Sequence, residues 1–457
     1  MQSGNIAGGL GKRLARMILA AGVLVASTLA PAHAGSNPLG FVPERTFGSN
    51  GFAALPAYVG ADAGTPITPI GLIRLDVSGG YIAATLQRIS GINRILLTKY
   101  TESGQLDGGW GAGGTWLPAL PSPMALGGSV DAIKLVAGRE NGQDIFYVAF
   151  TLDANPARYV AVGKFLASGA FDASFGFGGY AASTLPTSAP DGLIAVRGAA
   201  FTEVFGLPVL VVALGTTGGR LVFTRAHGSG TAALSDQGGG SSILIGAGPV
   251  ITQMRTFGPN HVELVGAVST VHALYVDYDA GTLASSWRML DLPCQGTAGW
   301  SMIDAVAHPA AFGGDTLVYG RVLCSTGVNT VVARIANVAA TSAQVVWWRV
   351  VEAGDQCNQG PVPCPQMMLA YDEAMLDHAL LVTPLRWFYP LRLSDGTLRL
   401  PGDSMASFGT PYPLPSTYRG GVLRHPRLVG FGEAAPFDAT KGVTSMLFDG
   451  IFSGDFD

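Results

Sequence analysis

The chain has 457 residues, of which 48% are hydrophobic and only 13% are charged, and its formal net charge at pH 7 is −4. The hydrophobic fraction is too high for an intrinsically disordered protein. The sequence contains no basic run, which argues against nucleic acid as a partner. The 64 glycines indicate frequent tight turns, as in a chain built mainly of β-sheet.

The first 34 residues have the pattern of a secretory signal peptide. Three basic residues within 12–16 precede the apolar stretch "MILAAGVLVASTLA" at 17–30, and "AHA" then predicts cleavage between Ala34 and Gly35. A membrane anchor or a buried helix is the alternative, but the stretch is short for a span and the cleavage signature follows it directly. We therefore expect an exported protein, periplasmic or extracellular.

Cleavage would leave residues 35–457 as the mature chain. The 27 basic residues, less the three in the leader, leave 24 against 31 acidic ones, a net charge of −7. No later apolar run is long enough to span a bilayer as a helix, so we expect no stable membrane insertion. We also expect a monomer without a cofactor or a bound metal.

Four cysteines in an exported chain indicate two disulfides. Three pairings are possible, and we favour Cys294–Cys324 together with Cys357–Cys364, which would close the short loop "CNQGPVPC". Zinc binding is the alternative, but the spacing is not that of a CxxC pair and no histidine is close by.

A repeated turn motif organises the mature chain. The segments "SGQLDGGW", "SGAFDASF" and "AGTLASSW" share a small residue, a glycine, then Leu or Phe, and an aromatic residue four positions later. The turn glycines recur every 51–65 residues, apart from one interval of 115 that we interpret as two periods with a degenerate copy near "NVAATSAQVVWW". They are Gly104, Gly169, Gly230, Gly281, Gly396 and Gly454. A period near this length is typical of propellers and other repeat arrays.

The two ends of the chain complement each other. The chain stops at "SGDFD" (453–457), which lacks the second half of the motif, and "RTFGSNGFAAL" from Arg45 supplies that half. Joined, they align without a gap on "SGAFDASFGFGGYAA", with Phe47 opposite Phe175. A unit shared between the termini closes a ring and removes two exposed sheet edges.

We therefore predict an all-β fold, a single seven-bladed β-propeller over residues 35–457 with four strands in each blade. The N-terminal strand is expected to complete the C-terminal blade. The predicted blades cover approximately 66–120, 128–186, 190–246, 249–293, 301–351, 366–405, and 418–457 with 44–56.

The strings "KYTESGQLDGGWGAGG" and "KFLASGAFDASFGFGGY" resemble the delta-60 repeat family, whose units contain a basic residue, a turn with Gly, Leu-Asp, and then Phe-Gly. The resemblance is good in the first, second and seventh blades, moderate in the third, fourth and sixth, and fades in the fifth. It implies a secreted, propeller-like repeat protein and implies no reaction.

The residues that recur in register have structural and functional interpretations. Asp107, Asp172 and Asp457 could bind calcium, but we favour Asx turns because other copies lack the aspartate and no second carboxylate follows at ligand spacing. The recurring aromatic residues are expected in the core between blades rather than in a ligand cage. They are Phe47, Trp110, Phe175 and Trp287.

The sequence contains no GxSxG or HExxH motif. The glycine run at 109–114 fits GxGxxG, but no helix is expected after it, so a phosphate cradle is excluded. The histidines after residue 34 are scattered, and we expect turn or surface positions for them. They are His227, His261, His272, His308, His378 and His425.

Long, irregular segments follow the fourth, fifth and sixth predicted blades, all on the face that carries the connections between blades, and all four cysteines fall on that face. Such loops could form a binding surface or could simply stabilise the fold. The candidate ligand-binding residues are Trp300, Gln356, Asn358, Tyr412, Tyr418 and Arg419.

Two functions fit these features. The first is an exported binding or structural module, with a glycan or an envelope protein as a possible partner and no chemistry of its own. The alternative is a secreted or periplasmic hydrolase or lyase with its site at the mouth of the propeller channel, where a histidine or perturbed carboxylates would converge. We favour the binding module and assign no catalytic residue.

Overall fold

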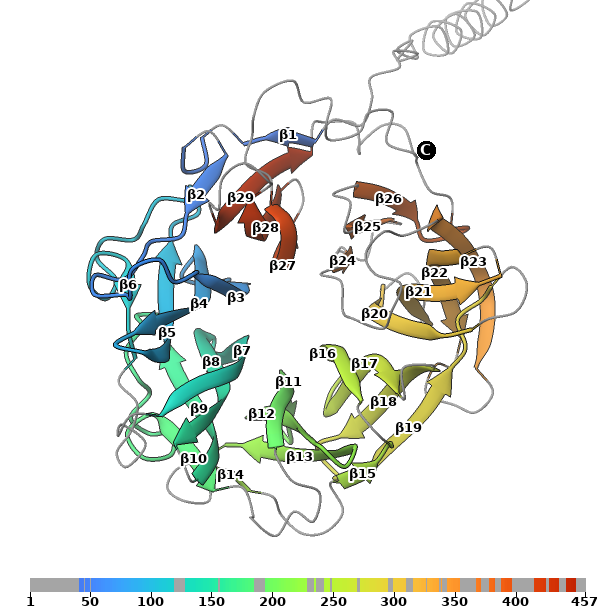
Figure 1. The fold of residues 1–457 in the computed structure, drawn as a ribbon, viewed down its shortest axis with the longest axis horizontal. Coiled ribbons are helices and arrows are strands. Elements are labelled where there is room, and N and C mark those ends of the chain that lie inside the picture. Colours follow the sequence, from blue (N-terminus) through green and yellow to red (C-terminus); the bar gives the residue numbers. More distant parts are fainter. Residues whose placement is uncertain are drawn as a thin grey trace, which may run out of the picture. The chain divides into compact units, whose positions relative to one another are not determined.

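The structure is a computed structural model, and every element in the part that it describes is a β-strand (Figure 1). The all-β class predicted from the sequence is therefore confirmed. The signal peptide and its cleavage site lie outside the described residues. These are 41–448 except 45, 50, 119–127, 155–156, 185–193, 228–233, 236–241, 247–248, 269–271, 295–298, 310–314, 326, 337, 339–342, 354–366, 371–377, 383–387, 397–414, 425–426 and 435–440.

The strands form antiparallel sheets that follow one another along the chain. In the described part, four sheets have four strands, two have five and one has three. Sheet 1 contains β3 (Thr68–Arg74), β4 (Tyr81–Ile89), β5 (Ile92–Tyr100) and β6 (Thr115–Trp116). Sheet 2 contains β7 (Ser129–Glu140), β8 (Gln143–Ala154), β9 (Ala157–Leu166) and β10 (Tyr180–Thr184). In both sheets the spatial order follows the sequence.

The next two sheets keep this topology. Sheet 3 contains β11 (Ile194–Val204), β12 (Leu207–Thr216), β13 (Arg220–Ala226), β14 (Leu234–Ser235) and β15 (Ser242–Leu244), with both short strands paired to β13. Sheet 4 contains β16 (Val250–Thr256), β17 (His261–Val268), β18 (His272–Asp279) and β19 (Ser285–Leu290).

Sheets 5 and 6 complete the middle of the chain. Sheet 5 contains β20 (Ser301–Ala307), β21 (Thr316–Cys324), β22 (Gly327–Ala336) and β23 (Gln344–Ala353). Sheet 6 contains β24 (Met367–Ala370), β25 (His378–Val382) and β26 (Phe388–Arg392).

Sheet 7 combines strands from both ends of the described chain. It contains β27 (Pro415–Arg424), β28 (Arg427–Ala434) and β29 (Lys441–Phe448), joined by β1 (Phe41–Pro43) and β2 (Phe52–Ala54). Both short N-terminal strands pair antiparallel with β29, Phe41 opposite Phe448 and Ala53 opposite Val443. Figure 1 shows β1 and β2 (blue) beside β29 (red).

The central strands of the sheets are buried on both faces. In β12, "LPVLVVALGT", every residue from Val209 to Thr216 is buried, and β17 is buried from Val262 to Val268. Continuous apolar runs of this kind occur when both faces of a sheet are covered. The apolar clusters accordingly combine side chains of neighbouring sheets: one joins sheets 1 and 2, and another joins sheets 2 and 3.

An aromatic ring lies against a turn glycine of the next sheet at several junctions. A Cβ at Gly169 in sheet 2 would lie 2.6 Å from the ring of Trp110. This ring is buried between sheets 1 and 2. Phe47 lies in the same way on Gly104, and Trp347 on Gly396, again at 2.6 Å. All three glycines have positive φ, between 71° and 88°. The motif therefore needs glycine both for the turn and for the approach of the ring.

The first strands of the sheets contact one another in sequence. β3 contacts β7, β7 contacts β11, β11 contacts β16, and β16 contacts β20. Further contacts join β20 to β24, β24 to β27, and β27 to β3. Each first strand therefore has neighbours in the sheets before and after its own.

Candidate functional site

Irregularities in the first strands are the feature that most distinguishes them from the other strands. The register shifts within β3, β7, β11, β16, β20 and β27, in the first half or at the middle of the strand. A β-bulge bends the strand, leaves a residue out of the ladder and redirects its side chain. We call these positions the bulge row: Ile70, Ala132, Ile133, Arg197, Thr252, Asp304, Ser416 and Arg419.

Two members of the bulge row are bound to the protein itself. The carboxylate of Asp304 receives two hydrogen bonds of 2.9 Å from the guanidinium of Arg321, whose side chain is completely buried. The hydroxyl of Thr252 donates to the carbonyl of Ile303, at 2.6 Å, in the next sheet. These positions stabilise sheet 5 and its junction with sheet 4, so they are not available for a ligand.

Sheets 2 and 3 each carry a cation at or next to the bulge of the first strand. Arg197 is the bulged residue of β11 and is exposed, and Lys134 is the half-buried residue that follows the bulge in β7. In the part of the chain that the structure describes, neither forms an ion pair or hydrogen bond. Burial lowers the pKa of Lys134, and the charge of Arg197 lowers it further. Among the described residues, the charge of Arg197 thus acts on Lys134 without an ion pair to offset it.

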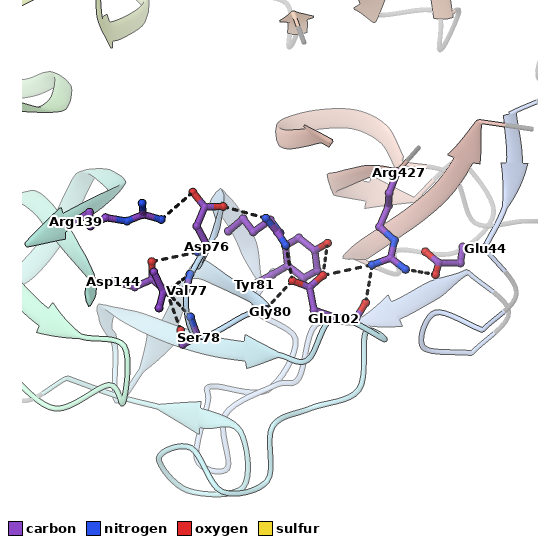
Figure 2. A network of polar contacts seen from close by, with 11 residues as sticks. Glu44, Asp76, Val77, Ser78, Gly80, Tyr81, Glu102, Arg139, Asp144 and Arg427 are labelled. Carbon is purple, nitrogen blue, oxygen red and sulfur yellow. Dashed lines mark hydrogen bonds and ion pairs between the residues drawn. The ribbon is translucent and has the colours of Figure 1, made fainter. Parts of the chain in front are cut away.

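By contrast, an extended network of ion pairs and hydrogen bonds joins sheets 7, 1 and 2 near the turns that follow their first and third strands. Figure 2 shows Arg427 of sheet 7 bonded to Glu44, and to Glu102 of sheet 1 at 3.3 Å. Glu102 also pairs with Arg74 at 2.9 Å. Burial alone would raise the pKa of Glu102, but the N–H of Gly80 and the charge of Arg74 hold it below its ordinary value.

Asp144 of sheet 2 extends this network to the turn after β3 (Figure 2). Its carboxylate accepts hydrogen bonds from the backbone N–H groups of Asp76, Val77 and Ser78, at 3.1, 2.8 and 2.7 Å. Burial would raise the pKa of Asp144, and these donors lower it instead. This network joins three sheets, and each of its carboxylates is held by a guanidinium or by backbone N–H groups, so it is a structural connection.

A histidine and a glutamate meet between sheets 4 and 5. His308 Nε2 lies 2.7 Å from Glu263 Oε1, and its Nδ1 lies 3.3 Å from the hydroxyl of Thr316. Glu263 is completely buried, and Phe257 stacks on the imidazole with ring centroids 4.5 Å apart. Both ring nitrogens of His308 thus have a partner within the protein. We interpret the pair as a connection between sheets 4 and 5, not as a catalytic acid and base.

The predicted ligand-binding residues fall into three groups. Trp300 is only 9% exposed and packs with Ala267, Met302 and Val328, so the structure gives it a packing role. Tyr418 and Arg419 lie on β27 rather than in a loop, and Arg419 falls at a bulge. Gln356, Asn358 and Tyr412 lie outside the described residues.

The predicted disulfide between Cys294 and Cys324 is confirmed, with the two Cα atoms 5.8 Å apart. It links the segment after sheet 4 to the end of β21 in sheet 5. Cys357 and Cys364 lie outside the described residues, so the second disulfide stays a prediction.

The recurring aspartates cap turns, as the Asx interpretation predicts. Asp172 Oδ1 accepts a hydrogen bond of 3.0 Å from the N–H of Ser174, and its other oxygen lies 2.7 Å from Lys164 Nζ. Asp107 bonds Gly109 and pairs with Lys99 in the same way, whereas Asp457 lies outside the described residues. The aromatic prediction also holds, because Phe47, Trp110 and Phe175 are buried and Trp287 packs on a core cluster.

Sequence reasoning missed Lys134 and Arg197. The available signal was a single cation within an otherwise apolar strand, in "DAIKLVAG" and "IAVRGAA". The register shifts next to Lys134 and at Arg197, on two strands that contact each other, carry no comparable sequence signature.

The described residues contain no candidate metal site and no candidate membrane helix. Among the described residues, no group of three or more His, Cys, Asp and Glu side chains could hold a metal ion. No helix long and apolar enough to cross a membrane occurs in that part of the chain.

Comparisons with known proteins give distant structural similarities. No family model matches the chain, and no curated protein matches it in sequence, so membership of the delta-60 repeat family stays a prediction. BamB from Moraxella catarrhalis is similar over 84% of this chain and 100% of its own, at 10% identity and a TM-score of 0.36. The BP39L lectin from Burkholderia pseudomallei is similar over 84% and 96%, at 13% identity and a TM-score of 0.43. Drosophila Semaphorin 2a is similar over 87% and 76%, at 10% identity and a TM-score of 0.45. We base no inference on these values.

Proposed function

We propose that the protein is an exported binding module built as a closed, seven-bladed β-propeller. Sequential antiparallel sheets with the same strand order support this architecture, because repetition around an axis buries both faces of every sheet. The contacts that join each first strand to the next, including β27 to β3, support closure. The pairing of β1 and β2 with β29 supplies the shared sheet that closure requires.

The binding surface lies, in this proposal, at the strand ends that carry the connections between sheets. The bulges of sheets 1 to 4 are closer to these ends than to the opposite ends, because they fall in the first half of their strands. The sequence prediction places the candidates Gln356, Asn358 and Tyr412 on the same face. The disulfide between Cys294 and Cys324 would hold one of these connections in place, which lowers the entropy lost on binding.

The observation that carries the proposal is the pair of cations on contacting, bulged first strands, Lys134 and Arg197, which form no ion pair within the described part of the chain. Functional sites commonly gather perturbed titratable groups and distorted backbone on a rigid scaffold. A purely structural repeat would have no need for them there.

Export is supported by the disulfide, because such bonds persist mainly in oxidising compartments. The signal peptide at 1–34 stays a sequence prediction. Peptide mapping of the protein purified from culture medium and from periplasmic extract would locate its N-terminus, which we expect at Gly35.

The proposed function is tested by applying the purified mature chain to an array of neutral and acidic glycans and to immobilised envelope proteins. We expect saturable binding to a restricted set of these. The matched control is the chain unfolded by reduction and denaturant. Absence of saturable binding to any of them would contradict a binding module, whereas turnover of a bound glycan would favour the hydrolase or lyase instead.

A further inference from the structure

Lys134 and Arg197 occupy comparable places on neighbouring first strands. β7 and β11 contact each other, and both shift register near their beginning. Lys134 is the first paired residue after the bulge of β7, and Arg197 is the bulged residue of β11. The same structural device therefore places one cation on each of two adjacent sheets.

Most other cations in the described part of the chain have partners. Arg74, Lys99 and Lys164 each lie within 3.0 Å of a carboxylate oxygen. Arg225 donates to the carbonyl of Ala280 at 2.9 Å. Against this background, two cations on contacting strands that bond neither a carboxylate nor a carbonyl of the described residues are exceptional. Lys134 is half-buried, so its ammonium group is not fully exposed to solvent.

The backbone near each cation has an unusual feature: a positive φ in the bulge before Lys134, and a glycine beside Arg197. Ala132, in the bulge before Lys134, has a φ of 46°, a conformation that costs a non-glycine residue roughly 1–2 kcal/mol. Next to Arg197, a Cβ at Gly215 would lie 2.7 Å from the guanidinium Nε, so a glycine provides the space for that side chain. Strain in the backbone commonly accompanies ligand sites.

The positive charges of the two side chains also favour a bound anion. Like charges at close range in a partly buried place are unfavourable. A bound anion would remove this repulsion, and the planar guanidinium with a neighbouring ammonium suits the oxygens of a carboxylate, phosphate or sulfate.

We propose that Lys134 and Arg197 together bind one oxyanion group of the ligand. The inference rests on the proposed binding function and narrows it to acidic ligands. The carboxylate of an acidic oligosaccharide and a phosphate or sulfate group share the required chemistry, and the experiment separates these sources.

Isothermal titration calorimetry of the full mature chain tests the assignment with four probes: oligogalacturonate, its methyl-esterified neutral form, inorganic phosphate and inorganic sulfate. At least one anion is expected to bind, and the neutral oligosaccharide is expected to bind at least tenfold more weakly than its acid form. Lys134→Gln and Arg197→Gln should each weaken anion binding about ten- to a hundredfold, the usual effect of losing one charge-assisted hydrogen bond.

Two further variants control for charge and folding. Lys134→Arg keeps the charge and should retain most of the affinity. Arg94→Gln removes a half-buried cation of sheet 1 that has no acidic partner among the described residues, and it should leave binding unchanged. Far-ultraviolet circular dichroism confirms that each variant keeps its sheet content.

The outcomes separate this inference from the proposed function. Binding of anions that is equal in wild type, Lys134→Gln and Arg197→Gln would overturn the assignment, as would an equal loss in Arg94→Gln. Binding of neutral glycans alone on the array would leave the binding module standing and refute the oxyanion site. Failure of every probe and of the whole array would contradict both.

Discussion

The junction between sheets 1 and 2 differs from that between sheets 4 and 5 in what holds the sheets together. At the first, Trp110 lies on Gly169 and its indole N–H donates to the carbonyl of Ala167 at 3.2 Å. At the second, an apolar cluster also joins the sheets, and polar and covalent contacts supplement it, with Arg255 donating to the carbonyl of Val306 at 2.9 Å and a disulfide nearby.

The difference teaches that one topology is maintained by two kinds of interaction. The intact repeat motif supplies the ring and the glycine in sheets 1 and 2. At the junction between sheets 3 and 4 the corresponding turn, in sheet 4, has changed: Gly281 is not in the left-handed region, and Leu283 has a φ of 65° instead. There Arg225 of sheet 3 bonds the carbonyl of Ala280 beside the changed turn, and at the following junction Arg255 and the disulfide supply similar links.

The largest expected effect comes from the glycine that meets the ring. Gly169→Ala should lower the free energy of unfolding by about 3 kcal/mol, because a methyl group would overlap the indole and φ is disfavoured for alanine. The matched variant Gly281→Ala, whose new Cβ would lie 3.2 Å from the carboxylate of Asp279, should cost less than about 1 kcal/mol. Urea denaturation measures both, and equal losses would contradict the distinction.

Removal of the disulfide comes next. The double variant Cys294→Ala and Cys324→Ala should lose about 2–4 kcal/mol, the usual contribution of a bridge that closes a loop of this size. Urea denaturation under non-reducing conditions gives the value. An unchanged midpoint would show that the apolar cluster and the polar contacts hold sheets 4 and 5 together without the bridge.

A smaller effect depends on pH. The pKa of Asp144 is lowered in the folded protein, so its stabilising contribution is present above its unfolded pKa and disappears as pH falls through the folded one. Asp144→Asn should therefore cost about 1–2 kcal/mol at pH 7, and the difference should shrink steadily below about pH 4. Stability measured from pH 7 to pH 2 tests this.

The exposed Asp153 offers the control for that series. Asp153→Asn should follow the wild-type curve at every pH, because its carboxylate has no partner among the described residues. A constant difference between wild type and Asp144→Asn down to pH 2 would show that the charge of Asp144 contributes nothing to the turn.

The smallest expected effect concerns one polar contact between sheets 4 and 5. Thr252→Val keeps the shape of the side chain but removes the hydroxyl that bonds Ile303, and it should cost about 1 kcal/mol. Thr252→Ser restores the hydroxyl and should recover part of that loss in the same denaturation assay. Equal stability of the wild type and the valine variant would remove this contact from the account of the junction.

The fold class was accessible from the sequence because its signals are local. The Ser-Gly turns, the buried runs such as "VLVVALG" and the aromatic residue four positions after Leu or Phe each reflect a backbone or packing requirement that a few residues satisfy alone. Even the degenerate copy keeps this logic, since Trp347 lies on Gly396. The pairing of Cys294 with Cys324 followed from placing both on one face of the predicted blades.

The candidate site was not accessible in the same way. A bulge depends on the pairing of two strands, so the sequence around Arg197 does not reveal that this residue leaves the ladder. Trp300 shows a similar dependence on the fold: an aromatic residue near a cysteine-bearing loop suggested ligand contact, and the structure packs it in a small apolar cluster at the start of sheet 5.

Closure through a sheet shared by the two ends of the chain is the central claim, and a cross-link tests it most directly. Ala53 and Val443 face each other in the ladder between β2 and β29, so cysteines at both positions should form a disulfide on mild oxidation. Peptide mapping by mass spectrometry should find this link in the monomer, and find none in a control pair at Ala53 and Leu292 of the segment after sheet 4. A linked fraction in the first pair no greater than in the control would contradict closure.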